Sequence, residues 1–577
     1  MKKRPLAVLS GLSAAAVGAA LVFSAPATTA LASTSTPQKG GTLVLALPPQ
    51  TNITWYFPIS NSANASEYNS QLQDQMYPLL IYINDQYKID YKDSFANNIT
   101  YNKAGTVFNI TLKHNWKWSD GQPVTSKDVV WDYQLIQATD SPNAPAPFPN
   151  YNAGSGGVPT NVKSVQATGK YSVRITLKKP VNQEWFIYNG IGQLIPLPEH
   201  AWNKYPTNMT EELKYLGKNA TNPNFFKVVD GPFKLQSAVS NQSWTLVPNP
   251  TFGGHKSTLD KVVFKYEGSS DSEFADLKTG NVNLGYLPMA QYGSKSQLTS
   301  MGDKINVGYN FGYYFIELNL LKGSPLYSAF NDVKVRKALE EGIDQNTINN
   351  SIYHGFAPPQ YGPIPKTPHT IFFDPTLNKP LFPFNIANAK KLLESDGWTM
   401  KNGVMTKGNQ QLKFTMLYAS GDESQTLMNE LIQSDWQKMG VDVTLKPLPF
   451  ANEIGIMSNA KEPNKWAAAS GTGITYGGSY PSGEQLFEPG GLDNFGFNNP
   501  ALDALIKKTN LPSPSAAQTK KNFFAYEEMT AKLLPVLWVN TAAGLGVSAP
   551  NVHNATNKYL NPTVGSDPLL NYIWMSK

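Results

Sequence analysis

The stretch Trp116-Lys117-Trp118-Ser119-Asp120-Gly121-Gln122-Pro123-Val124-Thr125-Ser126-Lys127-Asp128-Val129-Val130 is the most informative part of this 577-residue chain. Shortly before it, Phe108, Ile110 and Leu112 alternate with polar residues, which is the pattern of a strand buried on one face. Asp120-Gly121 then predicts a turn. The first half of this region therefore predicts a strand that ends in a tight turn.

The second half of the stretch predicts a helix with a defined start. Thr125 lies three residues before Asp128, so each side chain can satisfy a free backbone amide of the other at a helix N-terminus. Helical spacing gives this helix one apolar face, formed by Val129, Val130, Tyr133 and Ile136. No catalytic group is arranged here, so we interpret the unit, including Trp116 and Trp118, as structural.

The segment from Trp118 to Val129 resembles the signature of the oligopeptide- and dipeptide-binding proteins, the bacterial solute-binding protein family 5 that serves ABC importers. A second segment, Phe330-Asn331-Asp332-Val333-Lys334-Val335-Arg336-Lys337-Ala338-Leu339, resembles the opening of that family's second lobe. The resemblance covers most of residues 42–560. It implies an α/β fold of the two-lobed, periplasmic-binding-protein-like type II class, with an extra subdomain on the first lobe and a two-strand hinge.

The resemblance also implies a division of the chain. Lobe 1 would comprise residues 33–312 and 541–577, with the extra subdomain at about 60–185, and lobe 2 would comprise residues 313–540. Gly312 to Asn319 and Leu534 to Asn540 resemble the two strands that cross between the lobes. Arg336 is expected to be a structural ion-pair partner in the core.

The first 32 residues have the pattern of a secretory signal peptide. Lys2, Lys3 and Arg4 precede an apolar run from Leu6 to Phe23, and Ala30-Leu31-Ala32 offers the small residues of a cleavage site. The alternative is an uncleaved membrane anchor, because the run is of borderline length. We therefore expect an extracytoplasmic protein. The chain has no cysteine, which excludes a cysteine-anchored lipoprotein, disulfides and thiolate metal sites.

Net charge and composition also argue against other functional classes. The net charge is +6, but only three residues are arginine, Arg4, Arg174 and Arg336, so nucleic-acid binding is disfavoured. Charged residues make up 16% of the chain, against roughly 25% in typical soluble proteins. From this low charge content we form the hypothesis that the protein faces an acidic exterior. We also expect the protein to be a monomer.

A secreted glycoside hydrolase is the competing functional class, prompted by export and by the 12% aromatic content. It would need two carboxylates facing each other across a sugar, a pairing that sequence cannot exclude. The six histidines form no His-Glu-x-x-His motif, and there is no Gly-x-Ser-x-Gly elbow. We therefore predict a binding protein rather than an enzyme, with no catalytic residues, cofactor or metal site.

Aromatic residues near the expected cleft are the candidate ligand contacts. Trp55 and Tyr56 lie in an aromatic loop after the first core strand, Thr42 to Leu47, and Tyr286 lies near where oligopeptide binders place a cleft residue. Tyr313, Tyr314 and Trp538 lie on the two expected crossing strands. For each of these residues, the alternative to a ligand contact is a structural role, with the side chain packed beneath the loop or at the hinge.

The stretch from Trp466 to Pro481 indicates how the ligand is held. Family members that bind peptides commonly anchor the α-amine with an acid here, and this stretch contains none. Its glycines allow close backbone approach, and Trp466, Thr475, Tyr476 and Tyr480 offer polar groups and flat aromatic faces. We expect a peptide-like solute, delivered to the membrane permease of an ABC importer. An oligosaccharide is the alternative ligand, and the second lobe could instead bury these aromatics.

Overall fold

The computed structural model describes residues 36–141, 143–152, 154–489, 495–541, 543–560 and 568–577. The predicted signal peptide lies outside these residues. Helices and strands are mixed throughout, as the α/β prediction requires, and the strands form two large sheets and three smaller ones. None of the helices within the described ranges is long and apolar enough to cross a membrane.

A seven-stranded mixed sheet has the order β10-β19-β9-β1-β8-β7-β6. Its strands are β1 (Thr42–Ala46), β6 (Phe233–Val239), β7 (Ser243–Pro248), β8 (Lys261–Lys265), β9 (Leu284–Tyr286), β10 (Lys304–Tyr309) and β19 (Ala543–Ser548). β1 is parallel to both β8 and β9, and the connection between those two carries α6 (Ser270–Thr279). β1 is the predicted first core strand, so that prediction is confirmed, and β19 brings the end of the chain into the same sheet.

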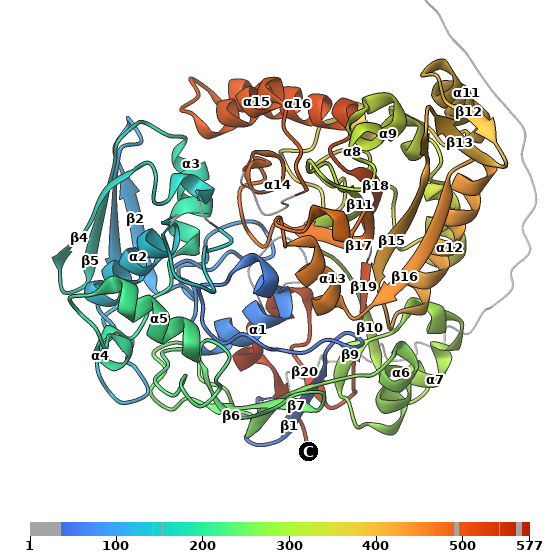
Figure 1. Ribbon diagram of the computed structural model, residues 1–577. Coiled ribbons are helices and arrows are strands. Elements are labelled where there is room, and N and C mark those ends of the chain that lie inside the picture. The colour runs from blue at the N-terminus through green and yellow to red at the C-terminus, as the bar shows by residue number, and fades with distance from the viewer. Residues whose placement is uncertain (1–35, 142, 153, 490–494, 542, 561–567) are drawn as a thin grey trace, which may run out of the picture. The chain divides into compact units, whose positions relative to one another are not determined.

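A four-stranded antiparallel sheet has the order β2-β3-β5-β4, made of β2 (Ala96–Tyr101), β3 (Val107–Leu112), β4 (Val162–Gly169) and β5 (Ser172–Leu177). α2 (Ser126–Thr139) lies alongside it (Figure 1). The predicted capping box is confirmed, because the backbone N–H of Thr125 donates to the Asp128 carboxylate at 2.7 Å. Trp116 and Trp118 are buried, in agreement with a structural role.

A five-stranded sheet has the order β16-β15-β17-β11-β18, made of β11 (Gly312–Leu318), β15 (Lys413–Ala419), β16 (Asp442–Leu448), β17 (Ala468–Thr475) and β18 (Leu537–Asn540). α12 (Glu423–Lys438) connects the parallel strands β15 and β16 and packs on both. A helix between two parallel strands agrees with the predicted α/β class. Figure 1 shows α12 covering one face of these strands.

The other longer helices lie against the sheets or in the connections between strands. They are α1 (Glu67–Met76), α5 (Met209–Asn219), α9 (Val333–Glu340), α11 (Ile386–Ser395), α13 (Phe450–Met457), α15 (Pro500–Asn510) and α16 (Ala516–Leu533). Short helices are α3 (Gln183–Trp185), α4 (Glu199–Trp202), α7 (Ser296–Thr299), α8 (Tyr327–Asn331), α10 (Gln345–Thr347), α14 (Glu484–Phe487) and α17 (Asn557–Leu560). A small hairpin sheet holds β12 (Thr399–Lys401), β13 (Val404–Lys407) and β14 (Gln410–Gln411), and β20 (Val552–His553) pairs with β21 (Trp574–Met575).

Arg336 on α9 corrects one detail of the sequence analysis. Its helix is capped by Asp332, and the guanidinium is buried. It donates to the backbone carbonyl oxygens of Phe330, Leu533 and Leu534 at 2.8 to 2.9 Å. The structural role is confirmed, but the predicted ion pair is wrong, because backbone carbonyls at the C-terminal end of α16 take the place of a carboxylate.

The chain passes between the two large sheets at two adjacent places. β10 leads into β11 through Asn310 and Phe311, and β18 leads into β19 through residues 541–542. β11 and β18 are antiparallel neighbours, with Tyr314 opposite Asn540 and Phe315 opposite Trp538. Two short connections that lie side by side are the arrangement of a hinge.

Candidate functional site

A cavity of about 780 Å³ lies between the seven-stranded and the five-stranded sheets. Its volume is in the range of ligand-binding pockets. It is lined by α1, β9 and β19 from one side and by β11, β17, α13 and the start of α12 from the other. A ligand in this cavity would therefore contact both sheets at once.

Strand β17 gives the cavity a wall made largely of main chain. Gly473 lies opposite Tyr314 of β11, and a Cβ atom added to Gly473 would come within 2.7 Å of the carbonyl oxygen of Tyr313. Glycine is therefore required by the close approach of the two strands. Gly471, Gly477 and other glycines of the segment also line the cavity, which exposes the backbone to a ligand.

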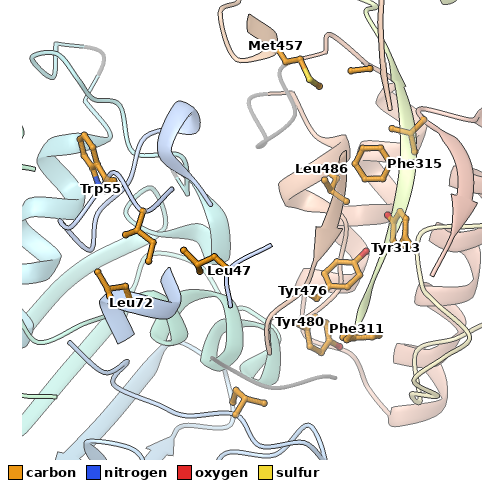
Figure 2. Close-up of a cluster of buried hydrophobic side chains, with 14 of the residues drawn as sticks. Leu47, Trp55, Leu72, Phe311, Tyr313, Phe315, Met457, Tyr476, Tyr480 and Leu486 are labelled. Atoms are coloured by element: carbon orange, nitrogen blue, oxygen red, sulfur yellow. The ribbon is translucent and has the colours of Figure 1, made fainter. Parts of the chain in front are cut away.

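Five of the ten predicted contact residues line the cavity: Tyr286, Tyr313, Tyr314, Thr475 and Tyr476. Tyr286 is 40% exposed and Tyr314 is half-buried, so both side chains are open to a ligand. Tyr313 and Tyr476 are almost fully buried, and the Tyr476 hydroxyl donates to the carbonyl oxygen of Pro363 at 2.6 Å. Figure 2 shows Tyr313 projecting from β11 toward Tyr476.

The other five predicted residues, Trp55, Tyr56, Trp466, Tyr480 and Trp538, are buried and lie outside the described cavity lining. The indole of Trp55 donates to the carbonyl oxygen of Ile59, and the Tyr56 hydroxyl accepts a hydrogen bond from Trp244. In Figure 2, Trp55 lies near Leu47 and Leu72, away from the aromatic side chains of β11. Trp55 and Tyr56 therefore pack beneath the loop in this structure, which is the alternative role considered for them.

Trp538 and Tyr480 pack against the cavity wall from behind. The ring of Trp538 meets the ring of Tyr313 edge to face, with centroids 5.5 Å apart. The Tyr480 hydroxyl accepts from the Asn182 amide at 3.1 Å, and its ring contacts Phe372 and Phe523. These residues can position the residues of the wall without touching a ligand in the cavity.

The sequence analysis missed one segment of the lining. No ligand contact was expected between residues 141 and 159, yet Asn150, Tyr151, Asn152 and Ser155 line the cavity, together with Tyr188 and Asn189. The density of asparagine and tyrosine in this loop was the available signal, because such side chains suit polar and stacking contacts.

The lining also includes carboxyl groups that the sequence analysis did not place there. The stretch from Trp466 to Pro481 has no acid, but α1 contributes Glu67 and the N-cap of α12 contributes Asp422. Desolvation inside the cavity raises the pKa of Glu67, although its side chain is open to the cavity and a hydrogen bond from Gln71 opposes the shift. Burial also raises the pKa of Asp422, against the hydrogen bond from the N–H of Ser424.

Glu484 is a buried carboxylate with a different role. It accepts hydrogen bonds from the N–H of Gly156, the indole of Trp185 and the amides of Asn189 and Asn510, at 2.8 to 3.0 Å. Neutral donors therefore satisfy both oxygens. The contact joins residues around the four-stranded sheet to the segment after β17, so Glu484 holds the two sides of the molecule together.

Within the described residues, no group of three or more histidine, aspartate or glutamate side chains is placed to hold a metal ion.

The sequence profile of the bacterial extracellular solute-binding proteins, family 5 (middle region), matches residues 91–493. This chain belongs to that family. A family 5 protein binds a solute outside the cytoplasm, which agrees with the predicted binding role and not with the alternative of a hydrolase.

Among curated relatives, the oligopeptide-binding protein AppA of Bacillus subtilis is 23% identical over 506 residues, which cover 86% of this chain and 85% of AppA. The structure of that AppA with a nonapeptide has a TM-score of 0.80 to this chain, at 20% identity, covering 94% of this chain and 100% of AppA. The structure of the periplasmic EDTA-binding protein EppA has a TM-score of 0.75, at 18% identity, covering 94% of this chain and 98% of EppA. The family 5 fold is thus shown, while two proteins of similar fold carry names for chemically different ligands.

Proposed function

We propose that this family 5 protein captures a peptide in the cavity between its two large sheets and delivers it to the membrane permease of an ABC importer. One observation carries the proposal. β17 pairs with β11 from Ala468 to Thr475, but β15 pairs with its other edge only from Ala468 to Ser470. Among the described strands, none pairs with that edge from Gly471 to Thr475.

This free edge lines the cavity, since every residue from Gly471 to Thr475 contributes to the lining. A strand edge presents unpaired N–H and C=O groups, which an extended peptide can satisfy by adding a strand. The glycines leave room for the peptide main chain. Recognition through the backbone suits a protein that accepts peptides of varied sequence, and the oligopeptide-binding relatives support it.

An oligosaccharide is the second candidate, because tyrosines are abundant in the lining. They are Tyr68, Tyr151, Tyr188, Tyr286, Tyr313, Tyr314 and Tyr476. Aromatic faces can stack on sugar rings as well as on peptide side chains. The free edge favours the peptide, because a sugar offers no regular series of amides to pair with a strand.

Calorimetry with defined ligand pools separates the two candidates. A pool of nonapeptides should bind, and N-methylation of alternate peptide nitrogens should weaken binding about tenfold, because methylated nitrogens cannot donate to the edge of β17. A pool of malto- and cello-oligosaccharides should not bind. Binding of the sugars with none of the peptides would overturn the proposal.

The division of the chain is part of the proposal. We assign lobe 1 to residues 33–312 and 541–577, with a subdomain at about 60–185, and lobe 2 to residues 313–540, because the two large sheets fall on either side of these boundaries. Closure of the lobes around a ligand would be a shift between two rigid-body states. The closed form of a monomer would then be recognised by the permease.

We propose an extracytoplasmic localisation, in the periplasm or on the outer face of the cytoplasmic membrane, after cleavage of a signal peptide at residues 1–32. We also propose that no lipid is attached through a cysteine side chain, because the sequence contains no cysteine. Intact mass and light scattering of the secreted protein test both the cleavage and the monomeric state.

A further inference from the structure

The charges of the cavity point to a class of ligand. Among the described residues of the lining, none is lysine, arginine or histidine. Beyond residue 35, the residues outside the described ranges include no basic residue in the sequence either. Carboxyl groups, in contrast, come from five residues of the lining, Glu67, Asp74, Asp132, Glu317 and Asp422. With acids and no bases among its described residues, the lining favours a ligand that carries a positive charge.

Glu67, Asp74 and Asp422 are not fully buried, and Glu67 and Asp422 are the two whose charges act on the same tyrosine, Tyr314. Glu67 is exposed and Asp422 is half-buried, whereas Asp132 is 1% exposed and accepts a hydrogen bond from the N–H of Ile195. Glu67 belongs to α1, which packs against β6 of the seven-stranded sheet. Asp422 precedes α12, which packs on the five-stranded sheet. The two acids thus approach the cavity from opposite sides.

Tyr314 links the two acids electrostatically. Burial, together with the nearby charges of Glu67 and Asp422, raises the pKa of the Tyr314 hydroxyl to about 12. The charge of Glu67 also raises the pKa values of Tyr68 and Tyr286, after desolvation by the surrounding protein as the larger cause. These phenols therefore remain neutral, and their rings near Glu67 offer aromatic surface that attracts a cation.

Unsatisfied acceptors in the same wall are an independent observation. Thr472 lines the cavity, is 4% exposed, and its hydroxyl has no hydrogen-bond partner among the described residues. The side-chain oxygen of Gln425, one turn into α12 from Asp422, likewise has none. A buried acceptor without a donor is costly. An ammonium or guanidinium group carries donors only, so it can supply what these oxygens lack.

We propose that Glu67 and Asp422, with the rings of Tyr68, Tyr286 and Tyr314, form a subsite for an alkylammonium or guanidinium group of the ligand. This inference rests on the proposed function and specifies it, because the bound peptides would be cationic at this position. The group can be the α-amine or a lysine or arginine side chain. Since the two acids lie on opposite sides of the cavity, the bound cation stabilises the closed form of the protein.

The test uses random nonapeptide pools that share one fixed position, occupied by lysine, norleucine or glutamate. Each pool is made with a free and with an acetylated N-terminus. The purified protein is mixed with each pool, and the retained peptides are quantified by native mass spectrometry. Pools with a free amine or a lysine should be retained about tenfold more than the acetylated norleucine pool, and the acetylated glutamate pool least. Comparing the free norleucine pool with the acetylated lysine pool shows which group occupies the subsite.

Variants of the two acids test whether Glu67 and Asp422 are the residues that retain the cationic peptides. Glu67→Gln and Asp422→Asn should each lower retention of the cationic pools at least about fivefold and leave the acetylated norleucine pool unchanged. Glu430→Gln is the matched control, because Glu430 lies exposed on α12 and outside the cavity lining. Far-ultraviolet circular dichroism of each variant verifies that the fold is kept.

The outcomes are distinguishable. Enrichment of cationic peptides that both acid variants abolish supports the subsite. Retention that ignores charge, or that survives both variants, overturns the subsite and leaves the proposed peptide binding intact. Retention of no peptide from any pool overturns the proposed function and the subsite with it.

Discussion

The carboxylate of Glu484 accepts a hydrogen bond from the indole of Trp185 at 3.0 Å, although 299 positions separate the two residues. A second contact of this kind runs nearby, because the Tyr87 hydroxyl donates to the carbonyl oxygen of Ser479 at 2.7 Å. Both contacts join the region of the four-stranded sheet to the segment that follows β17. These hydrogen bonds form within the chain, so part of the stability of this arrangement does not depend on a bound ligand.

The first prediction concerns Glu484. Replacing it by glutamine places an amide donor among the donors of Trp185, Asn189 and Asn510, and at least one buried group then loses its partner. We expect Glu484→Gln to lower the free energy of unfolding by about 2 kcal/mol. Urea unfolding measures this, with Glu430→Gln, which is exposed, expected to change stability by less than about 0.5 kcal/mol. Equal stability of the two variants would show that the hydrogen bonds to Glu484 do not matter.

The second prediction concerns stability against pH. Burial raises the pKa of Asp140 and Glu488 to about 7 and of Glu273 and Glu453 to about 8. Unfolded carboxyl groups titrate near pH 4, so between about pH 4 and pH 8 the folded protein binds more protons than the unfolded chain. The stabilisation is complete below about pH 4 and is lost as the pH rises through the folded pKa values.

We therefore expect the melting temperature to be higher at about pH 5 than at about pH 8. Scanning calorimetry at both pH values measures the difference, and Glu453→Gln should reduce it, because the amide cannot lose a proton and both oxygens of Glu453 are buried without a hydrogen-bond partner among the described residues. This outcome would agree with the acidic exterior inferred from composition. A stability maximum above pH 7 would contradict both.

The third prediction concerns the close approach at Gly478. A Cβ atom there would lie 2.9 Å from the Cβ of Ile83, a contact between two segments that both line the cavity, and the φ of Gly478 is +85°. Gly478→Ala should therefore separate these segments and weaken peptide binding at least about tenfold. Gly455→Ala is the control, since nothing lies within 4 Å of its Cβ position on α13. Calorimetry with the nonapeptide pool would refute the clash if both variants bound alike.

The fourth prediction separates a residue of the cavity lining from one that packs behind it. Tyr314 faces the cavity, whereas Trp538 lies outside the described lining and packs on Tyr313. Tyr314→Ala should lower peptide affinity about tenfold, and Trp538→Phe should change it by less than about twofold. Fluorescence titration and calorimetry measure these affinities. A large loss in Trp538→Phe would restore Trp538 as a direct ligand contact.

Sequence patterns were sufficient for the local elements of this fold. The capping box of Thr125 and Asp128 and the cap at Asp332 were predictable, because each depends on residues a few positions apart. The two crossing strands were found through family resemblance, and the structure places them as neighbours. Arg336 shows the limit, since two of the three carbonyl oxygens that it binds belong to residues almost 200 positions away.

The cavity was predicted only in part, for a related reason. Aromatic content selected Tyr286 and Tyr314, which line the cavity, but it also selected Trp55 and Tyr56, which are buried by packing. An aromatic side chain suits a core as well as a binding surface, and sequence does not show which face of a loop it occupies. Glu67 and Asp422 escaped notice because helix-start acids are usually capping residues, and only the tertiary fold brings them to one cavity.

The crystal structure of the protein with a peptide from the lysine pool tests the central claim most directly. We predict an extended peptide in the cavity, with its main chain hydrogen-bonded to the edge of β17 between Gly471 and Thr475 and a cationic group beside Glu67 and Asp422. A peptide bound elsewhere on the surface, or one in the cavity that makes no main-chain hydrogen bond to β17, would contradict the account.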